Sequence, residues 1–159
     1  MAKTYKIDKK TSCVILETIQ GSAGFILPEK GYLSSVKKRC EEVGALLILD
    51  EIQSGLGRTG KLFAYEHEDI KPDGLILGKA LGGAMLPISA FLSSKAVMDH
   101  FNAGSHGSTF GGNPLATKVA SRAIELLYED KLIENSHVLG EYFKSKLKAI
   151  DNKIIKDVR

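Results

Sequence analysis

The stretch Ala45-Leu-Leu-Ile-Leu-Asp50 decides the fold, because an uninterrupted apolar run ends there on an acid. A run of this length without polar alternation predicts a parallel strand, Ala45–Leu49, that is covered on both faces. The preceding segment, Glu29–Val43, carries apolar residues at helical spacing, and Gly44 is well placed to end that helix. A helix thus leads into a buried strand, as in α/β folds.

Further segments on both sides of this unit continue the alternation. Short apolar runs predict strands, and longer amphipathic runs predict helices. We expect strands at Ser12–Leu16, Gly74–Leu77 and Ile88–Leu92, helices at Ser94–Phe101, Pro114–Tyr128 and Lys131–Ile150, and a glycine-rich loop at Asn102–Asn113. The sequence therefore predicts an α/β layered fold with a mostly parallel sheet, in which ligands bind at the carboxyl ends of the strands.

Composition narrows the classes of function. The chain has 159 residues, which suits one domain, and its 22 basic and 19 acidic residues are scattered, so we expect no nucleic-acid interface. No apolar run approaches the roughly 18 residues of a membrane span, and no apolar segment follows the basic residues of Met1 to Lys10, so neither a membrane nor a signal peptide is predicted. Cys13 and Cys40 lack metal-ligand spacing and indicate a reducing, cytoplasmic compartment.

Two motifs suggest nucleotide binding but lack the required context. Gly55-Leu-Gly-Arg-Thr-Gly60 matches the dinucleotide fingerprint, yet the segment 50–54 separates it from the strand and no clear helix start follows it. Gly74-Leu-Ile-Leu-Gly-Lys-Ala80 approximates a phosphate loop, but it is one residue short and has alanine in place of the metal-binding hydroxyl. We therefore interpret the first motif as a turn-rich loop and the second as a strand with its following turn.

Three elements at the strand ends carry chemistry. Lys79 follows an apolar strand among glycines, where desolvation would make its amine a nucleophile toward an aldehyde. Asp50 ends the central strand, where burying a carboxylate costs folding free energy unless it meets a cation such as a protonated pyridine. Ser108 and Thr109 lie among glycines, whose backbone N–H groups suit a phosphate. A surface lysine, a salt-bridge acid and an ordinary polar loop are the alternative interpretations of these elements.

In this order the segments resemble the class III aminotransferases, which act on ornithine, acetylornithine or 4-aminobutyrate. The resemblance covers nearly the whole chain, and it rests on Leu49-Asp-Glu-Ile-Gln-Ser-Gly-Leu-Gly-Arg-Thr-Gly60, Leu77-Gly-Lys-Ala-Leu-Gly-Gly83 and Gly107-Ser-Thr-Phe-Gly-Gly-Asn-Pro114. It implies part of the three-layer α/β/α large domain of fold-type I transferases that depend on pyridoxal 5'-phosphate. Residues 1–159 would form the central and C-terminal part of that cofactor-binding domain, with the N-terminal segment and the C-terminal small domain largely missing.

The resemblance also implies roles for residues of the cofactor site. Lys79 would form the Schiff base with pyridoxal 5'-phosphate and move the proton between the substrate Cα and the cofactor. Asp50 would pair with the pyridinium nitrogen, and Gln53 would lie near the phenolic oxygen. Glu51 and Ile52 would add further cofactor contacts.

Other residues would act on substrate or on a second subunit. Thr109 would bind the phosphate of the neighbouring subunit's cofactor, which implies a homodimer with shared active sites. Ser108 would touch substrate, and Glu17 would support the site. Glu17-Thr-Ile-Gln-Gly21 resembles the family's Glu-Pro-Ile-Gln-Gly, with Thr18 in place of proline.

Within the family, the spacing of Lys79-Ala-Leu-Gly-Gly-Ala-Met-Leu-Pro87 resembles the enzymes that act on ornithine. The resemblance implies transamination of L-ornithine with a 2-oxo acid, giving glutamate 5-semialdehyde and an amino acid. Acetylornithine or 4-aminobutyrate is the alternative donor, because Ser22 replaces a glutamate that helps to sort substrates. A truncated, non-catalytic remnant is the alternative of another class, and we expect this segment alone to have little or no activity.

Overall fold

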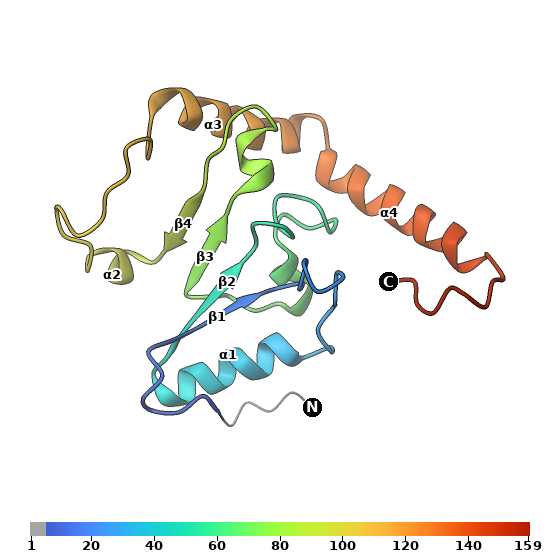
Figure 1. Cartoon of the computed structure of the whole chain (residues 1–159), viewed down its shortest axis with the longest axis horizontal. Coiled ribbons are helices and arrows are strands. Elements are labelled where there is room, and N and C mark those ends of the chain that lie inside the picture. The colour runs from blue at the N-terminus through green and yellow to red at the C-terminus, as the bar shows by residue number, and fades with distance from the viewer. Residues whose placement is uncertain (1–5) are drawn as a thin grey trace.

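The structure is a computed structural model that describes residues 6–159 and is built on one mixed sheet. The strands β1 (Cys13–Glu17), β2 (Leu46–Asp50), β3 (Gly74–Leu77) and β4 (Ala90–Ser93) lie in sequence order across it (Figure 1). β1, β2 and β3 run parallel, whereas β4 is antiparallel to β3. The predicted α/β fold with a mostly parallel sheet is therefore confirmed, as a partial domain.

The helix α1 (Tyr32–Val43) covers one face of the sheet and ends at Gly44, as the sequence predicts. Gly44 has a φ of +79°, a conformation that favours glycine. The helix begins three residues later than expected, because Gly31 takes a left-handed conformation with a φ of +83° and stands at its amino end. A turn formed by the Tyr32 N–H and the Glu29 carbonyl therefore occupies the start of the expected helix.

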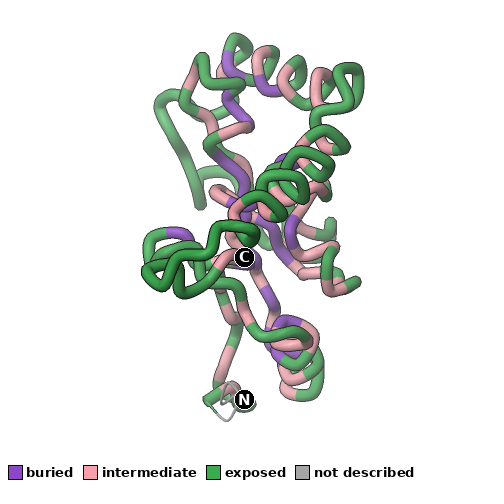
Figure 2. Tube along the Cα trace, turned by 90° about the vertical axis from the view of Figure 1, so that its right-hand side faces the viewer, coloured by how far each residue is buried: buried purple, intermediate pink, exposed green. Residues whose placement is uncertain are grey.

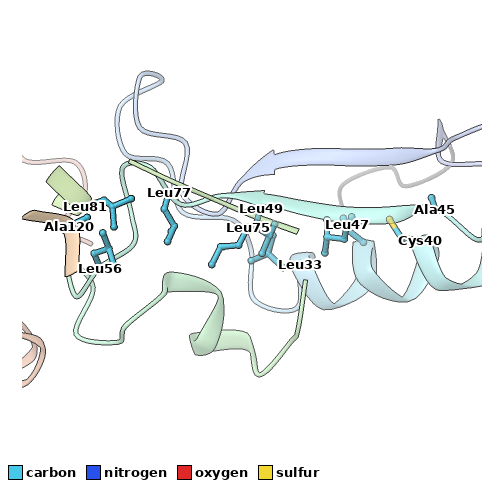
Figure 3. Close-up of a cluster of buried hydrophobic side chains, with 11 residues drawn as sticks. Leu33, Cys40, Ala45, Leu47, Leu49, Leu56, Leu75, Leu77, Leu81 and Ala120 are labelled. Atoms are coloured by element: carbon cyan, nitrogen blue, oxygen red, sulfur yellow. The ribbon is translucent and has the colours of Figure 1, made fainter. Parts of the chain in front are cut away.

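The core lies between α1 and the sheet and continues toward the carboxyl ends of the strands (Figure 3). Leu47 and Leu49 of β2 are completely buried and face α1, whose Leu33 and Cys40 pack against them. Truncating a leucine in such a core to alanine typically costs about 2–5 kcal/mol of folding free energy. This packing holds the carboxyl end of β2 in place.

Two single-turn 3₁₀ helices follow β2 and β3, and neither was predicted from the sequence. η2 (Ala64–Glu68) precedes β3, and η3 (Lys79–Gly82) follows it. β4 starts two residues later than expected because its first residue, Ala90, pairs with Leu77, the last residue of β3. The turn into η3 thus sets where the last strand can begin.

The C-terminal third of the chain consists of helices beyond the sheet. α2 (Lys95–Met98) is shorter than expected, although Ser94 caps it by accepting a hydrogen bond from the Val97 N–H. α3 (Pro114–Glu129) is capped by the Asn113 side chain and packs against η3, and α4 (Leu132–Lys148) follows directly. Figure 2 shows α4 and the C-terminal segment largely exposed, and the exposed apolar side chains of α4 include Val138, Leu139, Tyr142 and Phe143.

Candidate functional site

The candidate site lies at the carboxyl ends of β1, β2 and β3. Glu17, Asp50 and Ile76 are partners in adjacent strands. Paired residues point to the same face of a sheet, and neighbours along a strand point to opposite faces. Because Leu49 faces the α1 core, Asp50 and Glu17 face the other side of the sheet. Two acids therefore stand side by side where ligands bind in parallel sheets.

Asp50 is half-buried and has one oxygen free of protein partners. Its Oδ1 accepts a hydrogen bond from the Ile52 N–H at 2.9 Å, which fixes the start of the turn after β2. Its Oδ2 accepts no hydrogen bond from any residue in the described range 6–159. The carboxylate is thus oriented by its own loop while one oxygen stays available to a cationic group.

Lys79 occupies a strained backbone position at the start of η3. Its φ is +42°, in the left-handed region that non-glycine residues rarely adopt and that costs of order 1–3 kcal/mol. Gly78 precedes it and packs closely on the turn, since a Cβ there would lie 3.3 Å from Cγ2 of Ile52. Strain of this kind persists where the surrounding structure determines the conformation, and it concentrates at active sites.

The Lys79 amine contacts the turn after β2. Nζ donates a hydrogen bond to Oε1 of Gln53 at 2.8 Å, so the ends of β2 and β3 are joined by side chains. The amine is exposed, which corrects the expectation that the end of a buried strand would desolvate it. A strand can be buried while the residue beyond its end is not, because the chain leaves the sheet at Gly78.

The loop after β1 holds Gln53 in this position. The Gly21 N–H donates to Oε2 of Glu17 at 2.9 Å, which folds the loop back over the strand end. A Cβ on Gly21 would lie only 2.5 Å from Nε2 of Gln53, so the absence of a side chain at residue 21 makes room for the amide. Glu17, Gly21, Gln53 and Lys79 thus form a continuous series of contacts across the three parallel strands.

Glu51 is turned into the protein and is 1% exposed. Its Oε1 accepts from the Thr18 hydroxyl at 2.8 Å and from the Tyr65 N–H at 2.9 Å. Its Oε2 accepts from the Ser54 hydroxyl at 2.9 Å and from the Ala64 N–H at 3.0 Å. The carboxylate is fully engaged by protein donors, so its contribution to a cofactor site would be through the shape of the turn.

Ser108 and Thr109 lie on an exposed loop that the structure does not bring to Lys79. Every residue from 101 to 112 is exposed, and Phe110 is 80% exposed. The Ser108 hydroxyl accepts a hydrogen bond from the Gly111 N–H within the loop itself. Figure 1 shows this loop running between α2 and α3, on the side of the molecule away from β1.

Two of the three glycines of the segment 55–60 serve helix packing. A Cβ on Gly57 would meet Ile133 at 3.2 Å, and a Cβ on Gly60 would meet Cβ of His137 at 2.8 Å, both on α4. The Ser136 hydroxyl donates to the carbonyl of Arg58. The next helical turn after Gly60 in the described chain is the 3₁₀ turn η2. The interpretation as a turn-rich loop agrees with this packing.

Several residues that build the site were not singled out as such from the sequence. Thr18 was noted only as a departure from the family pattern, and Ser54 and Gly21 carried no functional prediction. Thr18 and Ser54 contact Glu51, which is 33 residues away from Thr18 in sequence. Gly21 lies against Gln53. Residues 6–159 contain no cluster of acids, histidines and cysteines that could hold a metal ion. No helix within that range is both long and apolar enough to cross a membrane.

The chain belongs to the class III aminotransferase family, whose model matches residues 2–159. It is similar to the ornithine aminotransferase of Macrococcus caseolyticus, with 56% identity over 96% of this chain and 38% of that protein. The chain therefore spans less than two fifths of the length of this relative.

Solved structures agree with this family assignment. The ornithine aminotransferase of Toxoplasma gondii, solved with pyridoxal phosphate at partial occupancy in its active site, is 41% identical with a TM-score of 0.94; the match covers 98% of this chain and 38% of that one. The acetylornithine aminotransferase of Elizabethkingia anophelis is 48% identical with a TM-score of 0.81, over 84% of this chain and 35% of that one. The predicted family and fold are confirmed.

Proposed function

We propose that the protein containing this chain transfers an amino group from L-ornithine to a 2-oxo acid with pyridoxal phosphate as cofactor. The products would be glutamate 5-semialdehyde and an amino acid. The observation that carries the proposal is the hydrogen bond between Lys79 Nζ and Gln53 Oε1 at the strand end that also presents Asp50. Membership of the class III family and 56% identity to an ornithine aminotransferase support it.

The side chains at the strand ends fit the functional groups of pyridoxal phosphate. An amine suits its aldehyde, a carboxylate suits its protonated ring nitrogen, and an amide suits its phenolic oxygen. Lys79, Asp50 and Gln53 supply these three groups, and Oδ2 of Asp50 is free of protein partners within residues 6–159. When bound, the cofactor supplies an electron sink that acidifies the carbon bearing the amino group.

The protein groups then have separate tasks. Asp50 keeps the ring nitrogen protonated, because a carboxylate favours a neighbouring positive charge. Lys79 holds the cofactor and later serves as the base that accepts and returns a proton at the amino-bearing carbon of the substrate. Gln53 orients the Lys79 amine, and Gly21, which donates to Glu17, leaves the space that the Gln53 amide occupies. Ile52 supports the turn through its contact with Gly78.

We propose that Thr109 and Ser108 act at the site of a second subunit. Their loop is exposed from residue 101 to residue 112, and the Ser108 hydroxyl bonds only to Gly111 of the same loop among the described residues, as expected of a segment that reaches a neighbouring chain. Thr109 would bind the cofactor phosphate there, and Ser108 would lie near substrate. A homodimer with shared sites follows from this arrangement.

Acetylornithine is the alternative donor. The likeness to the acetylornithine aminotransferase of Elizabethkingia anophelis supports it, and Ser22 is an exposed residue of the loop after β1, where a family glutamate would sort substrates. A comparison of kcat/KM for ornithine, acetylornithine and 4-aminobutyrate tests this, with ornithine expected to be the best donor. If ornithine were the poorest of the three, the substrate assignment would be wrong.

Borohydride reduction followed by peptide mapping tests the cofactor chemistry. Reduction converts the link between an amine and the cofactor aldehyde into a stable secondary amine, so the cofactor becomes a permanent label. We expect this label on the Lys79 peptide of the natural full-length protein. A folded sample without label at Lys79 would favour a non-catalytic remnant.

A further inference from the structure

We propose that Thr18 is a positioning residue for the cofactor-facing turn and that it acts through the buried carboxylate of Glu51. This inference rests on the proposed function, because the turn in question presents Asp50 and Gln53. Thr18 itself is 3% exposed, so it touches neither substrate nor cofactor. Its effect must pass through the residues that it contacts.

The Glu51 carboxylate ties three segments of the chain together. An ionised carboxylate accepts about four hydrogen bonds, and Glu51 accepts four. The donors are Thr18 after β1, Ser54 in the turn itself, and two backbone N–H groups at the start of η2. A buried charge is tolerated only with such partners. The carboxylate therefore sets the position of the turn relative to β1 and η2.

The backbone of Glu51 is held as firmly as its side chain. Its N–H donates to the Ile76 carbonyl at 2.9 Å, and its carbonyl accepts from the Gly55 N–H at 2.9 Å. A Cβ on Gly55 would lie 2.8 Å from that carbonyl oxygen, so the turn closes tightly on Glu51. The side-chain and backbone hydrogen bonds of Glu51 thus brace the same turn that carries Asp50 and Gln53.

Thr18 contacts this unit twice. Its backbone N–H approaches the Asp50 carbonyl at 3.4 Å, and its hydroxyl donates to Glu51 Oε1 at 2.8 Å. Without the hydroxyl, Oε1 keeps only the Tyr65 N–H, and the buried carboxylate loses one of its four donors, which weakens its hold on the turn. A proline at this position offers neither an N–H nor a hydroxyl. The threonine thus supplies a hydrogen-bonded support that this chain has built into its loop.

The experiment compares Thr18→Val, which keeps the shape but removes the hydroxyl, with Thr18→Ser, which keeps the hydroxyl. In the natural full-length protein, we measure pyridoxal phosphate affinity by titrating the apoprotein, the pH dependence of the bound cofactor's absorption, kcat and KM, and urea unfolding of the apoprotein. Ser93→Ala is the control, because it removes a hydroxyl bonded to the Asp73 carbonyl at the opposite end of the sheet.

We expect Thr18→Val to weaken cofactor binding about tenfold. It should shift the pH dependence of the cofactor absorption and lower kcat while KM for the amino donor stays unchanged. Thr18→Ser should restore all three, and Ser93→Ala should alter none of them. Ser54→Ala removes the other hydroxyl that donates to Glu51, and it should change the three quantities in the same direction. This variant replaces Thr18→Val in the test if Thr18→Val does not fold.

The outcomes separate this inference from the proposed function. If Thr18→Val loses stability toward urea but binds cofactor with unchanged affinity and absorption, Thr18 is a structural residue only and the inference is wrong. If the unaltered protein binds no pyridoxal phosphate at Lys79, both the proposed function and the inference fail.

Discussion

The two ends of the same sheet use the same residue types in opposite ways. At the amino end, both oxygens of Asp73 accept hydrogen bonds from Lys37 Nζ at 2.9 and 2.8 Å, and Oδ2 also accepts from the Leu47 N–H at 2.8 Å. At the carboxyl end, Asp50 accepts one hydrogen bond from its own turn, and Lys79 donates to a neutral amide. An acid and a lysine are therefore paired at one end and kept apart at the other.

The difference teaches that the partner decides the role of a charged residue. Asp73 forms an ion pair with Lys37, whose side chain is only 16% exposed, and this pair joins α1 to the sheet. Burial lowers the pKa of Lys37, but the hydrogen bonds and charges of Asp73 and, to a smaller extent, Glu41 outweigh it, so its pKa is raised. Asp50 and Lys79 form no ion pair within residues 6–159, and the backbone of Lys79 carries strain that Lys37, within α1, does not share.

Replacement of Lys79 tests the comparison with the largest expected effect. Lys79→Ala removes both the attachment of the cofactor and the proton-transferring base, so we expect kcat/KM to fall by at least about a thousandfold. Steady-state kinetics and borohydride labelling measure this. Lys95→Ala is the control, because Lys95 is an exposed lysine paired with Asp99. Near-normal activity of Lys79→Ala would show that Lys79 neither binds the cofactor nor transfers the proton.

The two acids can be compared directly with the same isosteric change. Asp50→Asn removes the charge opposite the ring nitrogen, and we expect kcat/KM to fall by roughly 10²–10³. Asp73→Asn should leave kcat per folded molecule unchanged, because Asp73 pairs with Lys37 at the opposite end of the sheet. Equal losses of kcat in both variants would show that the two ends do not differ as described.

Gly21→Ala tests the support of Gln53. A Cβ would lie 2.5 Å from Nε2 of Gln53, so the amide must shift from its position beside Lys79. Misplacement of catalytic groups on this scale typically costs about tenfold to a hundredfold, here in kcat. Gly140→Ala on α4 is the matched control, since a Cβ there meets nothing within 4 Å. Unchanged kcat in Gly21→Ala would show that Gln53 is not positioned by this contact.

The smallest catalytic effect and a clear effect on stability are expected at the amino end. Asp73→Asn should lower the free energy of unfolding by about 1.5–3 kcal/mol, because hydrogen bonds between charged groups are lost. A lysine with a raised pKa in the folded state stabilises below its unfolded pKa of about 10.4 and loses that contribution as pH rises through the folded pKa. The free energies of unfolding of wild type and variant should therefore differ near pH 7. The difference should shrink as the pH rises through the raised pKa of Lys37.

Much of the fold could be predicted from local pattern. The apolar run before Asp50, the helical spacing up to Val43 and the stop at Gly44 each follow from interactions within a few residues. Boundaries were less accurate where another segment sets them. β4 begins at Ala90 because of its partner Leu77, and α1 begins at Tyr32 because Gly31 takes a left-handed conformation.

The positions of the candidate site residues in the fold were predicted in part. Asp50 and Lys79 stand at the expected strand ends, and Gln53 lies next to Lys79. The burial of Glu51 was not foreseen, because it depends on Thr18 and η2, which are distant in sequence. The exposure of Lys79 was not foreseen, because the chain leaves the sheet at Gly78. Whether Thr109 reaches a cofactor stays a prediction, since its loop is exposed from residue 101 to residue 112 and does not reach Lys79 (Figure 1).

The sequence by itself determined the α/β class, the family and the identity of the acid and lysine at the strand ends, because apolar periodicity and short motifs are local properties. The tertiary structure alone decided which acid keeps an oxygen free of protein partners within residues 6–159 and which acids are fully hydrogen-bonded. Asp50, Glu51 and Asp73 are alike as residues, and only the sheet register, the turn after β2 and the position of Lys37 distinguish them. Charge becomes function or stability according to which donors the fold places within hydrogen-bonding distance.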